Sequence, residues 1–242
     1  MKKLFLLVCV FCYSLSYSQE NYRDNLIDYF HEGVIYLENG EEIKGKILID
    51  ELFPNCFRNM IYYINTPEEE DFIIRKNKLK KKFYKKIKPK KVLYMTIENE
   101  RKFVSIKYAD LTQLGLNSIP ARRMFEEMDE VSEGPIKLYK DYKGIYLEDG
   151  KTVDELGKEL VLHPYKILIY KDGKLKSIRN VKLQDYIMDQ AEVFKKYEAE
   201  RYGDLTEDFS TLVKSGLKED DYYEDDLIRL VNDYNEAVSE KN

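Results

Sequence analysis

Alternation of apolar and polar residues, interrupted by turn signals, dominates the chain up to about residue 180. The clearest case is the run from Val34 to Glu38, which is followed by Asn39-Gly40 and by a second alternating run to Ile49. Asn-Gly between two alternating runs is the strongest short signal for a β-hairpin. Similar runs lead into Asp149-Gly150 and Asp172-Gly173. The pattern predicts repeated hairpins in an antiparallel sheet.

Further segments rich in Ile, Val, Tyr and Phe lie between these hairpins and are bounded by polar or proline-containing breaks. They predict additional strands at residues 60–65, 71–76, 91–97, 102–107 and 135–142. Residues 122–131 fit two structures, because the spacing of Phe125, Met128 and Val131 suits a helix while their place between strands suits an irregular β segment. Together these segments predict a sheet of about eight to ten strands.

The alternation ends near Val181, and apolar residues then recur at the spacing of one helix face. One helix is predicted over residues 183–197, and a shorter one over residues 204–213. The last helix has the strongest pattern, with acidic residues 224–226 in its first turn, where the helix dipole favours negative charge, and apolar positions at Leu227, Leu230, Val231, Tyr234 and Val238. The predicted fold class is α+β, a mostly antiparallel β-sheet domain followed by two or three C-terminal helices.

The N-terminal residues have the pattern of a secretory signal peptide. Lys2 and Lys3 precede an uncharged stretch to Leu15, which is shorter than the ~20 residues that a membrane-spanning helix needs. Ser16 and Ser18 are the small residues that signal peptidase requires if cleavage falls before Gln19. We therefore expect a signal peptide at 1–18, a β-rich domain at 19–180, and a C-terminal helical segment at 181–242 packed on or beside it. The product is expected to be exported, to the periplasm or the cell exterior, with no transmembrane segment in the mature chain.

Composition narrows the class further. Removal of the signal would leave Cys56 as the only cysteine, so an ordinary core rather than a disulfide must hold the domain together. A chain with 35% charged and 13% aromatic residues is typical of a globular, water-soluble domain. Loss of the two N-terminal lysines takes the net charge from −5 to −7, which argues against nucleic acid as a partner.

The strongest local feature is a run of eleven cations within residues 75–91, with Phe83 and Ile87 among the interleaved apolar residues. Such a run can bind an anionic polymer or a phospholipid surface, and the candidate ligand-binding residues are Lys80, Lys81, Lys82, Lys85 and Lys86. The alternative is a solvated hairpin with Phe83 and Ile87 facing inward, whose lysines keep a sheet edge from pairing with another chain.

Acidic residues collect at the other end, where residues 200–242 hold 13 Asp or Glu against 5 Lys or Arg. The acidic runs lack the ligand spacing and the turn glycine of an EF-hand loop, so we expect a solvated helix start and no metal site. A second possibility is that this acidic segment docks on the basic run of the same chain.

Motifs for catalysis are absent from the sequence. His31 and His163 lie outside any metal or nucleophile motif, and no phosphate-binding glycine loop occurs. We therefore expect no catalytic residue, no metal and no cofactor. A hydrolase that uses an unidentified pair of carboxylates stays as the third functional hypothesis.

Three stretches carry a resemblance to a known group of proteins: residues 33–47, residues 133–139 (Glu-Gly-Pro-Ile-Lys-Leu-Tyr) and residues 227–235. Together they resemble uncharacterised secreted proteins of Bacteroidota, and the likeness covers most of the mature chain. The resemblance implies export and a β-rich fold with a C-terminal helix, and it implies no site, since that family has no established activity. Our leading hypothesis is an exported non-enzymatic protein that acts by contact with a protein or an envelope component. The alternative is a binding module for an anionic envelope ligand, with the lysine-rich hairpin 75–91 as its binding surface.

Overall fold

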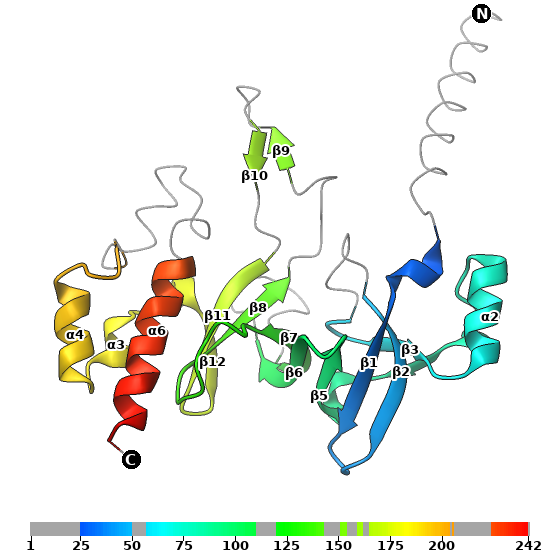
Figure 1. The fold of residues 1–242 in the computed structure, drawn as a ribbon, viewed down its shortest axis with the longest axis horizontal. Helices are drawn as coiled ribbons and strands as arrows, with labels where there is room; N and C mark the ends of the chain where they lie inside the picture. Colours follow the sequence, from blue (N-terminus) through cyan, green and yellow to red (C-terminus); the bar gives the residue numbers. More distant parts are fainter. Residues whose placement is uncertain are drawn as a thin grey trace, which may run out of the picture.

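The main element of the computed structural model is one antiparallel sheet (Figure 1). The structure describes residues 25–49, 57–109, 120–142, 151–153, 159–161, 165–203, 205 and 224–241. The strands of this sheet are β1 (Phe30–Leu37), β2 (Glu42–Leu48), β3 (Ile61–Ile64), β4 (Lys85–Ile87), β5 (Val92–Ile97), β6 (Arg101–Tyr108), β7 (Ala121–Glu127), β8 (Lys137–Tyr142), β11 (Tyr165–Lys171) and β12 (Lys174–Ser177). Their order is β12-β11-β8-β7-β6-β5-β1-β2-β3-β4, and a separate hairpin pairs β9 (Lys151–Val153) with β10 (Glu159–Val161).

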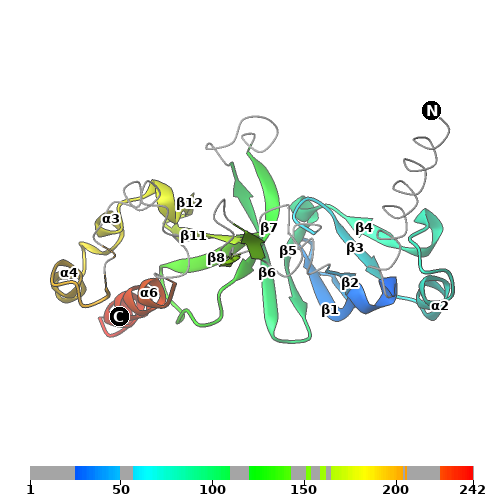
Figure 2. The same ribbon diagram turned by 90° about the horizontal axis from the view of Figure 1, so that it is seen from above.

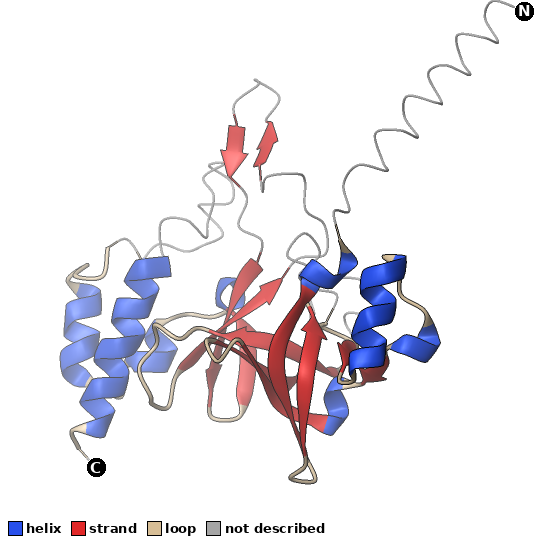
Figure 3. Ribbon diagram, turned by 45° about the vertical axis from the view of Figure 1, so that its right-hand side comes forward, coloured by secondary structure: helices blue, strands red, loops and turns tan. Residues whose placement is uncertain are grey.

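Helices lie at both ends of this sheet. The described α-helices are α2 (Pro67–Lys76), α3 (Gln184–Ile187), α4 (Ala191–Glu198) and α6 (Glu224–Ser239), and short 3₁₀ turns include η1 (Leu26–Tyr29), η2 (Lys81–Phe83), η3 (Pro89–Lys91) and η6 (Ile178–Asn180). Figures 1 and 2 show α3, α4 and α6 together at one end and α2 at the other. The colouring of Figure 3 separates these two helical ends from the strands between them. The fold is therefore broadly α+β and dominated by its sheet, as predicted, although one helix lies within the β-rich part.

The hairpins predicted at Asn39-Gly40 and Asp172-Gly173 are present. Asn39-Gly40 connects β1 to β2, and Gly40 has a φ of +86°. Asp172 and Gly173 connect β11 to β12 with φ values of +52° and +76°. Positive φ at both central residues, as at Asp172-Gly173, is the feature of two-residue turns whose twist matches that of paired strands; in the first turn only Gly40 has a positive φ. The strands predicted at 60–65, 91–97, 102–107 and 135–142 are also confirmed, as β3, β5, β6 and β8.

The strand predicted at residues 71–76 is wrong, because this segment is the second half of helix α2. The helix begins with Thr66, whose side chain accepts a hydrogen bond from the Glu69 amide at 3.4 Å, and Pro67 occupies the first helical position. Three glutamates fill the first turn, where the helix dipole favours them. These start signals outweigh the β preference of Phe72-Ile73-Ile74, of which Ile73 is buried.

The lysine-rich hairpin predicted at residues 75–91 is also wrong. The segment passes from the end of α2 through η2, the three-residue strand β4 and η3 into β5. Asn77 ends the helix in a left-handed conformation with a φ of +45°, and Pro89 begins η3, so neither arm extends far enough to pair with the other. Strand β4 pairs with β3 instead.

The structure also decides between the two alternatives for residues 122–131 and changes the helix predicted at residues 183–197. Residues 121–127 form strand β7, with Met124 and Phe125 buried on opposite faces, so the β alternative holds for most of 122–131. The helix predicted over residues 183–197 is divided into α3 and α4 by a turn at 188–190. Because the chain turns there, Ile187 and Val193 both pack in the core that α6 closes.

The core is divided between the two ends of the sheet. At one end α3, α4 and α6 enclose apolar residues of β8 and β11, so the C-terminal helices pack directly on the sheet. At the other end the curved strands β1, β2, β3, β5 and β6 enclose a second core around Ile35, Met95 and Phe103. Helix α2 covers a smaller cluster on the opposite face, around Phe30 and Ile73.

Helix α6 is positioned by a buried polar contact as well as by its apolar face. The Asn235 side chain is fully buried, accepts a hydrogen bond from the Ile136 amide at 3.1 Å, and donates to the Ser132 and Ile136 carbonyls at 2.9 Å each. A β-carbon on Gly134 would lie 2.3 Å from the Asn235 side chain, so glycine is needed for this close approach. The first turn of α6 lies far from the basic run, and Glu224 accepts a hydrogen bond from Tyr165 (2.8 Å), so this acidic turn does not dock on the basic run (Figure 1).

Several predicted features lie outside the described residues. They are the signal peptide at 1–18, Cys56, the strand that leads into Asp149-Gly150, His163, most of the helix predicted at 204–213, and the acidic run 219–221.

Candidate functional site

The eleven cations of residues 75–91 form one surface at the α2 end of the sheet, which we call the basic surface. Four short elements supply eight of them: the last turn of α2, η2, the edge strand β4, and η3; Lys78, Lys80 and Lys88 lie between these elements. All are exposed except Lys85, which is half-buried. The predicted candidates Lys80, Lys81, Lys82, Lys85 and Lys86 therefore lie at the same end of the sheet, although not on a hairpin.

Ten of these eleven cations have no ion pair with a described residue. The exception is Lys85, whose Nζ lies 3.3 Å from Glu69 Oε1 and also donates to Asn65 Oδ1. Arg75 donates only to the backbone carbonyl of Asp71, at 3.2 Å. Glu70, the next carboxylate along α2, already forms an ion pair with Lys46, in which Oε1 and Nζ are 2.5 Å apart. The positive charge of the basic surface is thus left for solvent or a ligand.

Apolar side chains are exposed beside these cations. Ile74 is 54% exposed and Leu79 is 39% exposed, on either side of the end of α2. Phe83 stacks on Phe72 with ring centroids 3.8 Å apart, which fixes η2 against α2, and Ile87 packs against the core around Met95. The inward position predicted for Phe83 and Ile87 is therefore confirmed, and the basic surface combines free amines with exposed aliphatic groups.

The alternative reading of the lysines also has a structural basis. Strand β4 is the edge of the sheet, and it pairs with β3 through only three residues. Lysines on a short edge strand prevent pairing with the edge of another molecule. That role accounts for Lys85 and Lys86, but Lys80, Lys81 and Lys82 lie outside the strand.

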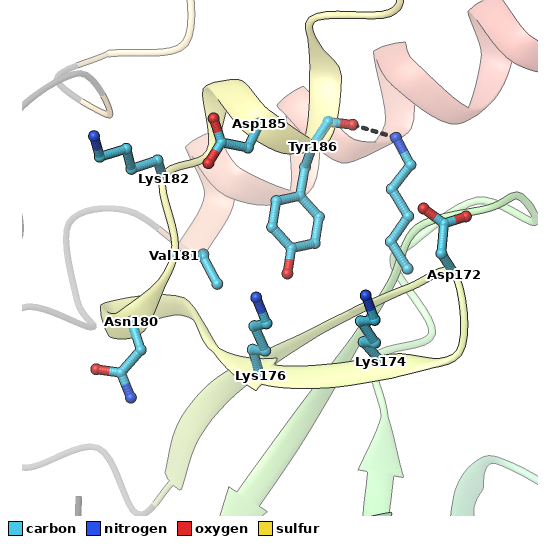
Figure 4. Close-up of a pocket in the computed structure, with 9 residues that line it drawn as sticks. Asp172, Lys174, Lys176, Asn180, Val181, Lys182, Asp185 and Tyr186 are labelled. Carbon is cyan, nitrogen blue, oxygen red and sulfur yellow. Dashed lines mark hydrogen bonds between the residues drawn. The ribbon is translucent and has the colours of Figure 1, made fainter. Parts of the chain in front are cut away.

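A second group of cations lines a pocket of about 460 Å³ between the β11–β12 turn, η6 and α3 (Figure 4). Lys174 and Lys176 project toward the same space as the Tyr186 ring. Lys171, in contrast, donates to the Tyr186 carbonyl at 2.6 Å and lies 3.4 Å from Asp189. Asp172 and Asp185 also line the pocket.

The charge of this pocket is partly balanced. Lys174, Lys176 and Lys182 have no ion pair with a described residue, but the carboxylates of Asp172 and Asp185 lie beside them. A bound anion would be repelled by these two groups, so the pocket is a weaker anion site than the basic surface. Sequence reasoning missed it, although the predicted hairpin already placed Lys174 and Lys176 on one face of a strand, two residues apart.

Candidate catalytic and metal-binding groups are not gathered in the described segments. His31 Nδ1 lies 3.0 Å from Glu98 Oε1 in a partly exposed pair between β1 and the β5–β6 turn. Within the same segments no group of three His, Cys, Asp or Glu side chains is placed to hold a metal ion. None of the helices described combines the length and the apolar character that a bilayer crossing requires.

Comparison of the chain with protein-family models, with curated proteins and with solved structures found no match. The geometry of the basic surface and of the pockets therefore carries the functional argument.

Proposed function

We propose that this protein is an exported, non-enzymatic binding protein that contacts an anionic phospholipid surface of the cell envelope through its basic surface. The observation that carries the proposal is the set of ten cations that have no ion pair within the described part of a chain whose net charge is −5. Ten such cations within seventeen residues concentrate a positive potential at one end of an acidic molecule.

The chemistry of the surface favours lipid over a soluble polyanion. Lysine is a compact point charge that binds phosphate without the fixed two-pronged geometry of arginine, and ten of the eleven cations are lysine. A lysine near an anionic bilayer contributes about 1 kcal/mol of binding free energy. Exposed Ile74 and Leu79 can enter the boundary between headgroups and acyl chains, which a polysaccharide does not offer.

Vesicle sedimentation tests the proposal. The variant K80Q/K81Q/K82Q/K86Q spares Lys85, because Lys85 already pairs with Glu69. We expect the wild-type chain to bind phosphatidylglycerol vesicles and not pure phosphatidylcholine vesicles, and the variant to bind about 100- to 1,000-fold more weakly. Raising the salt from about 0.1 M to 1 M shortens the screening length from ~10 to ~3 Å and should release the wild-type protein.

The matched control is K44Q/K174Q/K176Q/K182Q, which removes four other exposed lysines without ion pairs, three of them from the pocket of Figure 4. This control should lose only the part of vesicle binding that depends on net charge, because it removes the same number of positive charges from other places on the protein. Equal losses in the two variants would show that net charge, not the basic surface, governs binding. If the wild-type chain bound soluble polygalacturonate but not vesicles, and K80Q/K81Q/K82Q/K86Q lost the polygalacturonate binding, an anionic polysaccharide would replace lipid as the ligand of the basic surface. The double variant I74S/L79S should weaken vesicle binding at about 0.1 M salt and leave polysaccharide binding unchanged.

A further inference from the structure

A different pocket, of about 450 Å³, lies where β5, β6, β7, β8 and the turn after β11 face one another. The sheet curls in this region, so that β12 comes against β6 although three strands separate them in the order. Side chains on the inner side of the curl form a small core around Phe125 and Leu168. We call the pocket at its mouth the tyrosine pocket, after Tyr94, Tyr139 and Tyr170, which line it together with Val104 and Ile106. Its volume is in the range of ligand pockets, about 300–1,000 Å³.

The aromatic rings of the tyrosine pocket are held in fixed positions. Tyr139 and Tyr170 are perpendicular, with ring centroids 6.4 Å apart. Tyr94 stacks on Tyr36 with centroids 4.3 Å apart. Rings fixed in this way, next to aliphatic side chains, offer a preorganised apolar surface for a flat or ring-shaped ligand.

Tyr139 also carries a polar group without a partner. The residue is 4% exposed, and its hydroxyl, which makes no hydrogen bond to any described residue and is not fully buried, is open to the pocket. A hydroxyl in this position can bond a ligand that enters the pocket. Burial, and next the negative charge of Glu127, raise the pKa of Tyr139, so the hydroxyl keeps its proton at neutral pH. Since Tyr139 and Glu127 both line the pocket, a ligand with hydrogen-bonding groups would supply the missing partner.

The charged groups of the pocket give it a net positive charge. Glu127 is held between Lys102, at 2.9 Å, and Lys137, at 2.6 Å. Burial raises the pKa of Glu127, but hydrogen bonds from these two lysines outweigh the burial and hold the pKa below its ordinary value. Lys107 and Arg122 also line the pocket, but Arg122 pairs with Glu38 outside it at 2.8 Å, so three lysines are set against one carboxylate. The ammonium of Lys102 lies 5.6 Å from the centroid of the Tyr94 ring.

We propose that the tyrosine pocket binds a sugar unit that bears a carboxylate, such as a hexuronate. The apolar face of the sugar ring would lie against the tyrosine rings, its hydroxyls would bond Tyr139 and Glu127, and its carboxylate would face Lys102. An aromatic or aliphatic acid would match the apolar walls and the cations but would leave Tyr139 unsatisfied. The inference does not rest on the proposed function, because the pocket uses no residue of the basic surface.

Titration of the mature chain with trigalacturonate, followed by calorimetry or by tyrosine fluorescence, tests the inference. The chain has 21 tyrosines and no tryptophan, so its fluorescence reports directly on tyrosine environments. We expect saturable binding, and about tenfold weaker binding for Tyr139→Phe, which removes one hydroxyl and keeps the ring. Lys102→Gln should weaken binding of trigalacturonate several-fold more than binding of neutral maltotriose.

Two controls keep this test separate from that of the basic surface. The variant K80Q/K81Q/K82Q/K86Q should bind trigalacturonate as the wild-type chain does, and a loss in this variant would place the binding on the basic surface and overturn the inference. Absence of saturable binding, or unchanged affinity in Tyr139→Phe, would also overturn it. If Tyr139→Phe lowers the unfolding midpoint, the exposed Lys102→Gln variant still decides the result, because unchanged affinity there contradicts the predicted role of the carboxylate.

Discussion

Arg101 in the middle of the sheet and Lys81 near its edge show two different uses of positive charge. Arg101 binds Glu126 through two hydrogen bonds of 2.7 and 2.9 Å, and Tyr142 donates to the same carboxylate. These hydrogen bonds raise the pKa of Arg101. Lys81 is exposed and has no ion pair with a described residue. The two cations therefore differ in their surroundings: a carboxylate pairs with Arg101, and none of the described carboxylates pairs with Lys81.

A second paired group lies next to the first. The Arg58 guanidinium lies 3.1 Å from Asp141 Oδ2, and the Lys166 ammonium lies 3.4 Å from the same atom. The side chains are 11%, 2% and 13% exposed, respectively. The backbone of Arg58 also contacts the sheet. Its carbonyl accepts a hydrogen bond from the amide of Met124, a residue of β7 that is not paired with β8. The comparison suggests that central charges hold the strands in place, while the charges of the basic surface are free to bind a ligand.

The largest effect is expected from Asp141→Ala, which removes the anion from two buried cations. Leaving a buried charge without its partner costs about 3–5 kcal/mol, so the free energy of unfolding should fall by that amount in urea denaturation. The triple variant R58M/D141L/K166M, which removes all three charges, should recover most of the loss. If Asp141→Ala lowers the free energy of unfolding by less than about 1 kcal/mol, the charges of Arg58, Asp141 and Lys166 do not stabilise the fold, which contradicts the distinction drawn between central charges and the basic surface.

A smaller and pH-dependent effect is expected at Glu127. Because its pKa is lowered in the folded protein, ionised Glu127 stabilises the fold above its unfolded pKa of about 4.3. That stability is lost as the pH falls through the lower folded pKa. Since Lys102 and Lys137 are partly exposed, we expect Glu127→Gln to lower the free energy of unfolding by about 1 kcal/mol at pH 7.

The measurement is urea unfolding of wild type and Glu127→Gln between pH 7 and pH 3. The difference between the two proteins should shrink below about pH 4 and approach zero. A difference that stays constant over this range would show that the carboxylate charge contributes nothing, and that the substitution acts through packing alone.

The parts of the fold that sequence could predict are those set by local chemistry. Asn39-Gly40 and Asp172-Gly173 have turn conformations that few other residue pairs adopt, so both hairpins followed from the chain itself. Helix α6 followed from the spacing of Leu227, Leu230 and Tyr234, all of which are buried. In residues 66–76 the apolar run predicted a strand, but the capping Thr66, Pro67 and the glutamates of the first turn decided for a helix.

Contacts between distant segments were not predictable in this way. Strand β5 pairs with β1 across about sixty residues of sequence, and nothing in either strand specifies that neighbour. The tyrosine pocket depends on the curl of the sheet, which brings Tyr94, Tyr139 and Tyr170 together. For the basic surface the sequence predicted the residues and their exposure. It did not predict the elements that carry them, because Asn77 and Pro89 end the regular structure on each side.

The smallest effect on stability is expected from K80Q/K81Q/K82Q/K86Q, the variant with the largest expected effect on lipid binding. None of the four lysines has an ion pair with a residue that the structure describes, and removing like charges from one surface relieves repulsion. Its urea midpoint at low salt should therefore equal or slightly exceed that of the wild-type chain, and added salt should reduce any difference. A lowered midpoint would mean that these lysines support the end of the sheet as Arg58 and Lys166 support its middle. A loss of vesicle binding in that variant would then reflect partial unfolding, so an unchanged midpoint is what allows the binding result to be assigned to the surface itself.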